Sequence, residues 1–339
     1  MQKVVIWGCG GIARFHMAAY RKLADEGNAV CLAAACDMNP KAFESNIKIN
    51  ISTEQTQAKT QKINYYTDID EMLDAEKPDV VDICLPAFLH TDAIIDMLNK
   101  NYNVICEKPM ALNYEDCKKI LAAEEKSSAK LMIAHQLRFD PAYTYLKETI
   151  RSEKFGKPLS ASFSRLSPPP TWGNGSWHLD KSKCGGVRIE MSVHDVDMAN
   201  WLFGKPTGVF CYTGGHISGC DSMQALLYYP DNISVHIEGD WSFYKTFSFY
   251  YSYRVNFERA TLEMDNRQGC ILYTEEGSRK IEFPETDAML EEIRYFIDAV
   301  RNDKNIETVS SESVSETMKI EDMLFESAKQ GGKLITNLN

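Results

Sequence analysis

A short glycine-rich turn directly after the first apolar run most constrains what this 339-residue chain folds into. The run Lys3–Trp7 leads into GCGGIA at residues 8–13, which has the form G-x-G-x-x-A and opens a helical pattern. Gly8 permits a tight turn, Gly10 lets the backbone approach a pyrophosphate without a Cβ in the way, and the small Ala13 lets the helix pack close to the strand. The free N–H groups at the start of such a helix attract an anion. We therefore expect a dinucleotide to contact Gly8, Gly10, Gly11 and Ile12.

The second apolar run ends at an acidic residue that selects the type of dinucleotide. Asp37 follows Ala13 by 24 residues, near the interval of about 20 that is typical of dinucleotide-binding folds. A carboxylate at this place accepts hydrogen bonds from ribose hydroxyls and repels a 2′-phosphate, so we expect NAD to be preferred over NADP. A second interpretation stays open, in which the glycine turn belongs to an unrelated α/β protein and Asp37 only caps the next helix.

Short apolar runs alternate with helical patterns up to about residue 155, which is typical of a doubly wound parallel sheet. The expected strands are Lys3–Trp7, Val30–Cys36, Asn64–Tyr66, Val80–Leu85, Asn103–Cys106 and Lys130–His135. The expected helices are Ile12–Glu26, Pro40–Asn46, Thr91–Lys100, Tyr114–Ser127 and Pro141–Lys154. The polar residues 47–62 are expected to form a surface excursion. These patterns predict an N-terminal Rossmann domain over residues 1–135.

The second part of the chain, residues 136–339, has a different pattern. The segment SPPPTWGNGSW is expected to be a loop, and runs rich in Tyr, Phe, Val and Ile then predict a mostly antiparallel sheet. The expected strands are Val209–Thr213, Met223–Tyr229, Ile233–Trp241, Thr246–Asn256, Ala260–Asp265, Cys270–Tyr273 and Lys280–Phe283. Two helices, Thr286–Arg301 and Val314–Gln330, close the chain, and the last of them is a candidate to pack back on the first domain. We expect an open-faced α+β domain for substrate binding and oligomerisation.

The composition of the chain limits the kinds of molecule that it can be expected to bind. A formal net charge of −11 argues against nucleic acid and anionic lipid, and no apolar stretch approaches the length of a membrane span. The chain begins with a strand pattern rather than a signal peptide, and its ten cysteines include no C-x-x-C pair. We therefore expect free thiols, a cytoplasmic location and no metal site.

Candidate functional residues follow the predicted strands, where a doubly wound fold binds its ligands. Leu85, Pro86 and His90 follow the fourth strand, and the triplet Glu107-Lys108-Pro109 follows the fifth. Arg138 begins an RFDP segment after the sixth strand, and a Gly-Gly turn at residues 185–186 precedes Glu190, His194 and Asp197. With the glycine turn, these motifs resemble the Gfo/Idh/MocA oxidoreductase family over nearly the whole chain.

The resemblance implies that hydride passes between a nicotinamide and a secondary hydroxyl of a sugar or cyclitol. It implies proton-handling roles for Lys108, Glu190 and His194, cofactor contacts from Leu85, Pro86, His90, Glu107 and Lys108, and a homodimer or homotetramer formed through the C-terminal sheet. Two positions depart from the family pattern, because Glu190 replaces the usual Asp and Ser192 replaces the usual Gly. The longer Glu190 side chain puts the role of this acid in doubt more than that of the histidine.

The chemistry of these residues also fits the oxidation of an alcohol. Residues four apart on a helix share a face, so a helix that starts near Ile189 would present Glu190, His194 and Asp197 together. Oxidation of an alcohol needs a base for the hydroxyl proton, and histidine titrates in the suitable range. Each residue also has a purely structural interpretation. Lys108 would be a solvated lysine at a strand end, His194 a hydrogen-bonded interface histidine, and Glu190 an acid that pairs with Arg188 or Lys108. Asp197 would be a structural residue on a helix face, and His90 would cap a helix.

The loop near residue 172 is expected to complete the substrate pocket. A sugar ring would stack on Trp172 or Trp177, with Arg138, Lys108, Glu190, His194 and Asp197 contacting hydroxyls. The two tryptophans could equally anchor the loop or a subunit contact. Two other functions stay open on this fold: a glycosidase that oxidises, eliminates and re-reduces its substrate with a tightly held NAD, and a non-enzymatic sensor of NAD and sugar.

Overall fold

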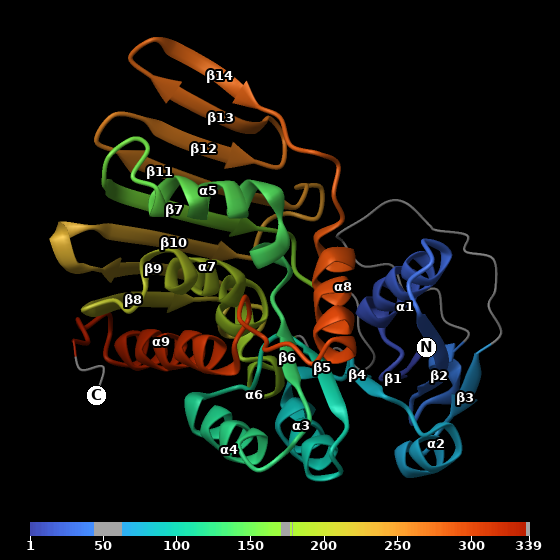
Figure 1. Cartoon of the computed structure of the whole chain (residues 1–339). Helices are drawn as coiled ribbons and strands as arrows, with labels where there is room; N and C mark the ends of the chain where they lie inside the picture. Colours follow the sequence, from blue (N-terminus) through green and yellow to red (C-terminus); the bar gives the residue numbers. More distant parts are fainter. Residues whose placement is uncertain (44–62, 171–176, 178, 337–339) are drawn as a thin grey trace. The chain divides into compact units, whose positions relative to one another are not determined.

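A computed structural model of the chain describes residues 1–43, 63–170, 177 and 179–336 (Figure 1). The described chain divides into two compact units. The first unit comprises Met1–Gln136, Trp172–Trp177 and Asp287–Ser315, and the second comprises Leu137–Thr171, His178–Thr286 and Glu316–Asn339. The expected boundary at residue 135 lies next to the observed break after Gln136. The expected surface excursion at residues 47–62 falls outside the described residues.

The first unit is a six-stranded parallel sheet in the order β3-β2-β1-β4-β5-β6. This order is that of a Rossmann fold, as expected. Its strands are β1 (Gln2–Trp7), β2 (Val30–Cys36), β3 (Asn64–Tyr66), β4 (Val80–Ile83), β5 (Asn103–Glu107) and β6 (Leu131–Ala134). Its helical segments are α1 (Gly11–Asp25), η1 (Pro40–Phe43), α2 (Ile69–Glu76), η2 (Ala87–Leu89), α3 (His90–Asn99), α4 (Tyr114–Glu124) and α8 (Ala288–Arg301).

Helices cover both faces of this sheet, so most residues of its strands are buried (Figure 1). The central strand β4 and the edge strand β6 are buried at every residue, which explains why their apolar residues follow one another instead of alternating with exposed polar ones. α1 packs against α8, and α3 packs against α4 (Figure 1). An ion pair of 2.8 Å between Arg294 and Glu26 ties α8 to the end of α1. The first unit therefore takes one of its helices from a segment that follows the second sheet in the chain.

The second unit is built on an eight-stranded mixed sheet in the order β14-β13-β12-β11-β7-β10-β9-β8. Its strands are β7 (Pro158–Leu166), β8 (Gly208–Gly214), β9 (Ser222–Tyr228), β10 (Ser234–Asp240), β11 (Tyr250–Phe257), β12 (Thr261–Asp265), β13 (Gly269–Thr274) and β14 (Gly277–Ile281). Its helical segments are α5 (Pro141–Arg151), α6 (Lys181–Cys184), η5 (Arg188–Ser192), α7 (Val193–Phe203) and η6 (Pro230–Asn232). Two further segments, η3 (Gln136–Phe139) and α9 (Ser311–Lys329), cross from one unit to the other.

The strand register gives this second sheet one apolar and one polar face. One row of cross-strand neighbours is buried and consists of Tyr253, Phe163, Ile237, Ala225 and Cys211. The next row points to the other face and consists of Arg254, Ser162, His236, Leu226 and Phe210. β7 pairs in parallel with β10 and antiparallel with β11, so the expected antiparallel sheet contains one parallel pairing.

All ten cysteines are free thiols, as expected from their scattered positions. Eight of them are buried, and Cys31 and Cys220 are half-buried. Among the described residues, no helix combines the length and the apolar character that a membrane span needs.

Candidate active site

The glycine turn between β1 and α1 has the geometry that its sequence predicts. Gly8 has φ +101°, and a Cβ on it would lie 2.6 Å from the carbonyl oxygen of Cys84 at the end of β4. Gly10 caps α1 with φ −70°, and no atom lies within 4 Å of the place where its Cβ would be. Ala13 is fully buried against the sheet. Gly8 is thus required by the fold itself, whereas the space above Gly10 is open and fits an anion on the helix N-terminus.

The two glycines allow a matched test of this assignment. We expect Gly8→Ala to destabilise the protein, because it meets both a positive φ and a backbone clash. Gly10→Ala meets neither, so its melting temperature should stay that of the wild type while NAD binding weakens about tenfold or more. Thermal melting and a fluorescence titration with NADH would check both. Wild-type affinity in Gly10→Ala would contradict a pyrophosphate over this turn.

Asp37 is fastened to the glycine turn by backbone amides. Its two carboxylate oxygens accept hydrogen bonds from the N–H of Cys9 at 2.9 Å and the N–H of Asn39 at 2.8 Å. Arg14, which the sequence analysis did not consider, lies at the same edge and donates to the carbonyl of Ala42 at 2.8 Å. The acid expected to contact the ribose is therefore held next to the turn, with one arginine close by.

His90 is the first residue of α3 and contacts two loops at the carboxyl edge of the sheet. Its Nδ1 lies 2.7 Å from the carbonyl oxygen of Pro109, and its Nε2 lies 2.8 Å from that of Leu85. The side chain is 1% exposed. The ring therefore ties the loop after β4, which contains Leu85 and Pro86, to the loop after β5.

Lys108 follows β5 directly, and its backbone is held by the preceding residue. Glu107 accepts a hydrogen bond from the N–H of Lys108 at 3.1 Å through Oε2, while its Oε1 lies 3.0 Å from Nε2 of His16. Burial raises the pKa of Glu107, but the hydrogen bond and charge of His16 outweigh it, and the net pKa is lowered. Glu107 is therefore a buried carboxylate, and Lys108 leaves the strand end half-buried.

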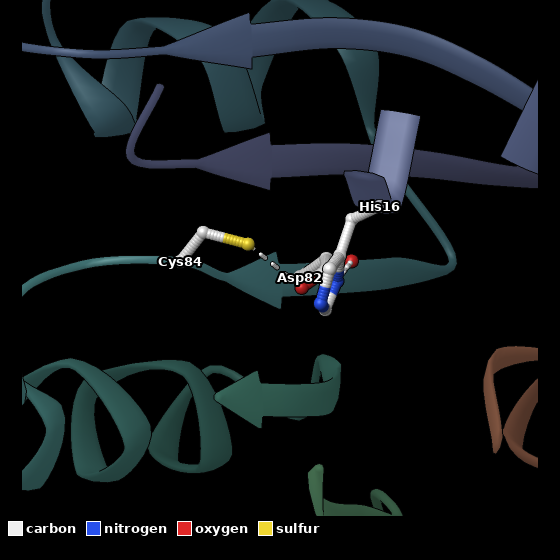
Figure 2. Close-up of side chains that lie close together, drawn as sticks. All are labelled: His16, Asp82 and Cys84. Atoms are coloured by element: carbon white, nitrogen blue, oxygen red, sulfur yellow. Dashed lines mark hydrogen bonds and ion pairs between the residues drawn. The ribbon is translucent and has the colours of Figure 1, made fainter. Parts of the chain in front are cut away.

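His16 of α1 lies between two carboxylates and was not predicted as a functional residue. Its Nδ1 lies 2.8 Å from Oδ2 of Asp82 on β4 (Figure 2). Its other nitrogen, Nε2, makes the contact with Glu107. Burial lowers the pKa of His16, but the Asp82 carboxylate and the Cys84 sulfur raise it, and the net pKa lies well above the ordinary value. The ring is thus an imidazolium that donates from both nitrogens.

Glu292 of α8 completes this buried group. It is 1% exposed, and its Oε2 has no hydrogen-bond partner among the residues that the structure describes. Burial is the main cause that raises its pKa well above the ordinary value, the charges of Glu107 and Asp82 add to it, and His16 opposes it. Glu292 is therefore a neutral carboxylic acid near neutral pH.

This protonation state gives a stability prediction. The unfolded chain releases the Glu292 proton above a pH of about 4.3, whereas the folded chain keeps it, so the folded state loses stability as pH rises toward the raised pKa. Gln does not titrate, and the charged neighbours on α1, β4, β5 and the Asp287 cap of α8 stay the same. We expect the melting temperature of Glu292→Gln minus that of the wild type to increase from pH 5 to pH 9. A difference independent of pH would contradict the neutral acid.

The second unit presents Glu190 and His194 where a π-helical turn passes into an α-helix. Glu190 lies in η5 and His194 in α7, and both are half-buried, whereas most of their helical neighbours are buried. A π turn bonds i to i+5, so the side chains do not follow the i, i+4 rule that the sequence analysis assumed. Ser192, the departure from the family pattern, is accommodated by β10, since a Cβ on Gly239 would overlap its Oγ.

Arg138 and Asp197 were expected to contact substrate hydroxyls, but the structure pairs them with each other. Nε and Nη2 of Arg138 donate to the two oxygens of Asp197 at 2.9 and 2.6 Å, and Thr317 donates to the same acid at 2.9 Å. The two side chains are 1% and 0% exposed. A buried charge needs its counterion, so this pair supports the helix that carries His194.

Aromatic residues gather near the loop after β4. Trp177 meets the ring of Phe88 edge-on, with 6.5 Å between ring centroids. Phe88 is 41% exposed and was not predicted as a functional residue, because a single Phe in a loop carries no pattern. Trp172 lies outside the described residues.

Curated relatives match this chain over part of their length, as three of them illustrate. YteT of Bacillus subtilis is 32% identical over 158 residues, which cover 45% of this chain and 36% of that protein. The 2,7-anhydro-N-acetylneuraminate hydratase of Mediterraneibacter gnavus is 27% identical over an alignment that covers 48% of this chain and 44% of that protein. Inositol 2-dehydrogenase of Salmonella typhimurium is 26% identical, and its alignment covers 60% of this chain and 55% of that protein. These alignments span between about a third and just over half of each relative.

The fold is shared with solved structures over the whole chain. Levoglucosan dehydrogenase, in a complex with NADH and levoglucosan, matches with a TM-score of 0.84 and 18% identity and covers 100% of both chains. Two family models also match: the NAD-binding Rossmann fold of the oxidoreductase family over residues 2–135, and the GFO/IDH/MocA C-terminal domain over residues 143–263. The resemblance seen in the sequence is thereby confirmed, and the chain belongs to the Gfo/Idh/MocA oxidoreductase family.

Proposed function

We propose that the protein is an NAD-dependent oxidoreductase that acts on a secondary hydroxyl of a sugar or cyclitol. One arrangement supports this most strongly: a single sheet edge carries the open turn at Gly10, the fixed carboxylate of Asp37 and the strand-end Lys108. These are an anion site, a ribose acceptor and a cation at the carboxyl ends of β1, β2 and β5, the edge of the sheet where this fold class binds nucleotide and substrate.

The residues present fit NAD. Gly8, Gly10, Gly11 and Ile12 would hold the pyrophosphate, and Asp37 would accept the ribose hydroxyls and disfavour a 2′-phosphate. Leu85, Pro86 and the Glu107–Lys108 segment would line the nicotinamide end, with His90 acting through its contacts to both loops. Bound NAD supplies the hydride acceptor.

The chain's own residues handle the substrate and its proton. We assign to His194 the removal of the hydroxyl proton, and to Lys108 the orientation of the reacting oxygen and a part in the transfer of its proton. Glu190 would contact either of them. Trp177 with Phe88 offers an aromatic face for a ring that carries hydroxyls. The buried pair of Arg138 and Asp197 supports this site from within the second unit.

The substrate class follows from relatives that act on cyclic polyols. Inositol 2-dehydrogenase and levoglucosan dehydrogenase are named for a cyclitol and an anhydrosugar. The hydratase among the relatives favours a second candidate, a reaction that is redox-neutral overall and uses NAD catalytically. In that case the protein would cleave or hydrate a sugar derivative without net formation of NADH.

One assay separates these candidates. Purified protein is mixed with NAD and with NADP in parallel, against inositols, pyranoses, anhydrosugars and aryl glycosides, while NADH absorbance and product release are followed. NADH formation with NAD and a group of polyols is the expected result. Product release without NADH formation would favour the redox-neutral candidate, and equal rates with NADP would refute the role of Asp37.

We also propose a cytoplasmic homodimer or homotetramer formed through the outer face of the second sheet. Ten free cysteines suit a reducing compartment. The outer face carries Ser162, His236 and Arg254 together with Leu226 and Phe210, so such an interface would combine polar and apolar contacts. Light scattering during size-exclusion chromatography would refute it by giving the mass of a monomer.

A further inference from the structure

Two buried histidines hold the backbone on either side of Lys108. On the preceding side, His16 bonds to Oε1 of Glu107, whose Oε2 accepts the N–H of Lys108. On the following side, His90 bonds to the carbonyl of Pro109. The two histidines are 0% and 1% exposed. A half-buried lysine is thus flanked by two rigid contacts that come from α1 and from the start of α3.

Each ring is also anchored at its other nitrogen. His16 bonds to Asp82 at 2.8 Å, and the Cys84 thiol donates to the second oxygen of Asp82 at 3.5 Å (Figure 2). Nε2 of His90 lies 2.8 Å from the carbonyl oxygen of Leu85. This oxygen accepts, as does that of Pro109, so both contacts are hydrogen bonds when the ring carries a proton on each nitrogen. A ring whose two nitrogens are both hydrogen-bonded cannot rotate without losing a buried hydrogen bond. Each histidine therefore fixes the position of one structural element relative to the next.

The donor atoms of His16, Asp82 and Cys84 lie within 4.8 Å of one another, as metal ligands also do. Two observations favour a hydrogen-bond network instead. Each nitrogen of His16 lies at hydrogen-bond distance from a carboxylate. Burial and the nearby Asp82 raise the pKa of the Cys84 thiol, which keeps it protonated and therefore a poor ligand.

We propose that His16 and His90 are positioning residues for Lys108, which fix the strand end and loop from which the lysine side chain leaves. This inference rests on the proposed function, because Lys108 matters only where it orients a substrate oxygen. It concerns residues of the first unit alone.

The chain offers a matched set of amide variants for the test. The amide nitrogen of Asn takes the place of Nδ1 of a histidine, and that of Gln takes the place of Nε2. His16 reaches Glu107 through Nε2, so His16→Gln keeps this contact and His16→Asn loses it. His90 reaches Pro109 through Nδ1, so the order is reversed and His90→Asn keeps the contact. All four variants remove one buried hydrogen bond and the ring.

We expect kcat to be about tenfold or more higher for His16→Gln than for His16→Asn, and likewise for His90→Asn over His90→Gln. The melting temperature should fall by similar amounts within each pair, and KM for NAD should change less than kcat. A purely structural role would instead make kcat follow the melting temperature. Equal kcat values within both pairs, or the reversed order, would overturn the proposal.

A second measurement needs no activity. Reductive ¹³C-methylation labels the lysines, and the Lys108 signal is identified by its absence in Lys108→Arg. The signal should keep its wild-type shift in His16→Gln and His90→Asn and move or broaden in the other two variants. An unchanged signal in all four refutes the positioning role even if the wild type is active. A wild type that is silent in the polyol assay refutes the proposed function separately. Stoichiometric zinc in the purified protein would also overturn the proposal, since His16 would then be a ligand.

Discussion

Lys108→Met is expected to lower kcat by about 10²- to 10⁴-fold on the polyol that the wild type oxidises, the range typical of a lost proton-handling group. Met has a similar length and no charge, so the change removes the ammonium group and little packing. The backbone on either side of residue 108 stays held, by Glu107 on one side and by the contact of His90 with the Pro109 carbonyl on the other. Melting temperature and NADH affinity should therefore stay near wild-type values, as stopped-flow turnover, thermal melting and fluorescence titration would measure.

The matched control is Lys119→Met on α4. Lys119 is 60% exposed and bonds to Asp116 in the same helix, so its loss should leave kcat unchanged. A Lys108→Met protein that turns over at the rate of the Lys119→Met control would remove Lys108 from the reaction. The first unit would then contribute the cofactor-binding glycine turn and Asp37 to the site, but no catalytic residue.

Of the single substitutions, Arg138→Met should lower the free energy of unfolding most, by about 3–5 kcal/mol, because it removes the guanidinium that pairs with the buried Asp197. The two guanidinium hydrogen bonds to this acid disappear, while Thr317 continues to donate to it. Replacing both partners, as in Arg138→Met with Asp197→Leu, removes the charge pair together. The double variant should recover most of the lost stability, because apolar residues replace a buried ion pair at little net cost.

The exposed pair Arg151 and Glu148 on α5 gives the comparison. Nε of Arg151 lies 2.9 Å from a carboxylate oxygen of Glu148, and the two side chains are 75% and 58% exposed. Solvent screens such a pair, so Arg151→Met should leave the stability close to that of the wild type. Denaturant titration of the four proteins would measure the difference. If Arg138→Met is as stable as Arg151→Met, the buried pair does not support the helix of His194.

Local signals predicted most of the first unit. β2 and β3 have the bounds that were expected, and Asn113 caps α4 by accepting from the N–H of Asp116. Helix α2 was missed because its sequence is acidic and short of apolar residues, although Asp68 bonds to the N–H of Glu71 in the manner of an N-cap. Strand β7 was missed because its serines made it look polar. Its outer face is indeed polar, and the central place of β7 in the sheet depends on pairing with strands far along the chain.

The contacts that organise the site are long-range, and no local pattern encodes them. His16 meets Asp82 and Glu107 across 66 and 91 residues, and Arg138 meets Asp197 across 59. The sequence could name Lys108, His194 and Asp37 from motif spacing and family resemblance. It could not assign His90 to the two carbonyls that it bridges, nor separate the buried Asp197 from the half-buried Glu190, since burial is a property of the folded chain.

The late position of α8 has a consequence for the order of synthesis. A ribosome completes residues 1–136 long before it adds the helix that covers α1 and brings Glu292 beside His16. Until then the nascent Rossmann sheet has an uncovered apolar helix face and an incomplete buried polar group. The nucleotide half of this enzyme class thus reaches its final state only after the other half has been translated. A chain that ends before residue 287 should therefore be a substrate for chaperones and proteases rather than a working NAD-binding fragment.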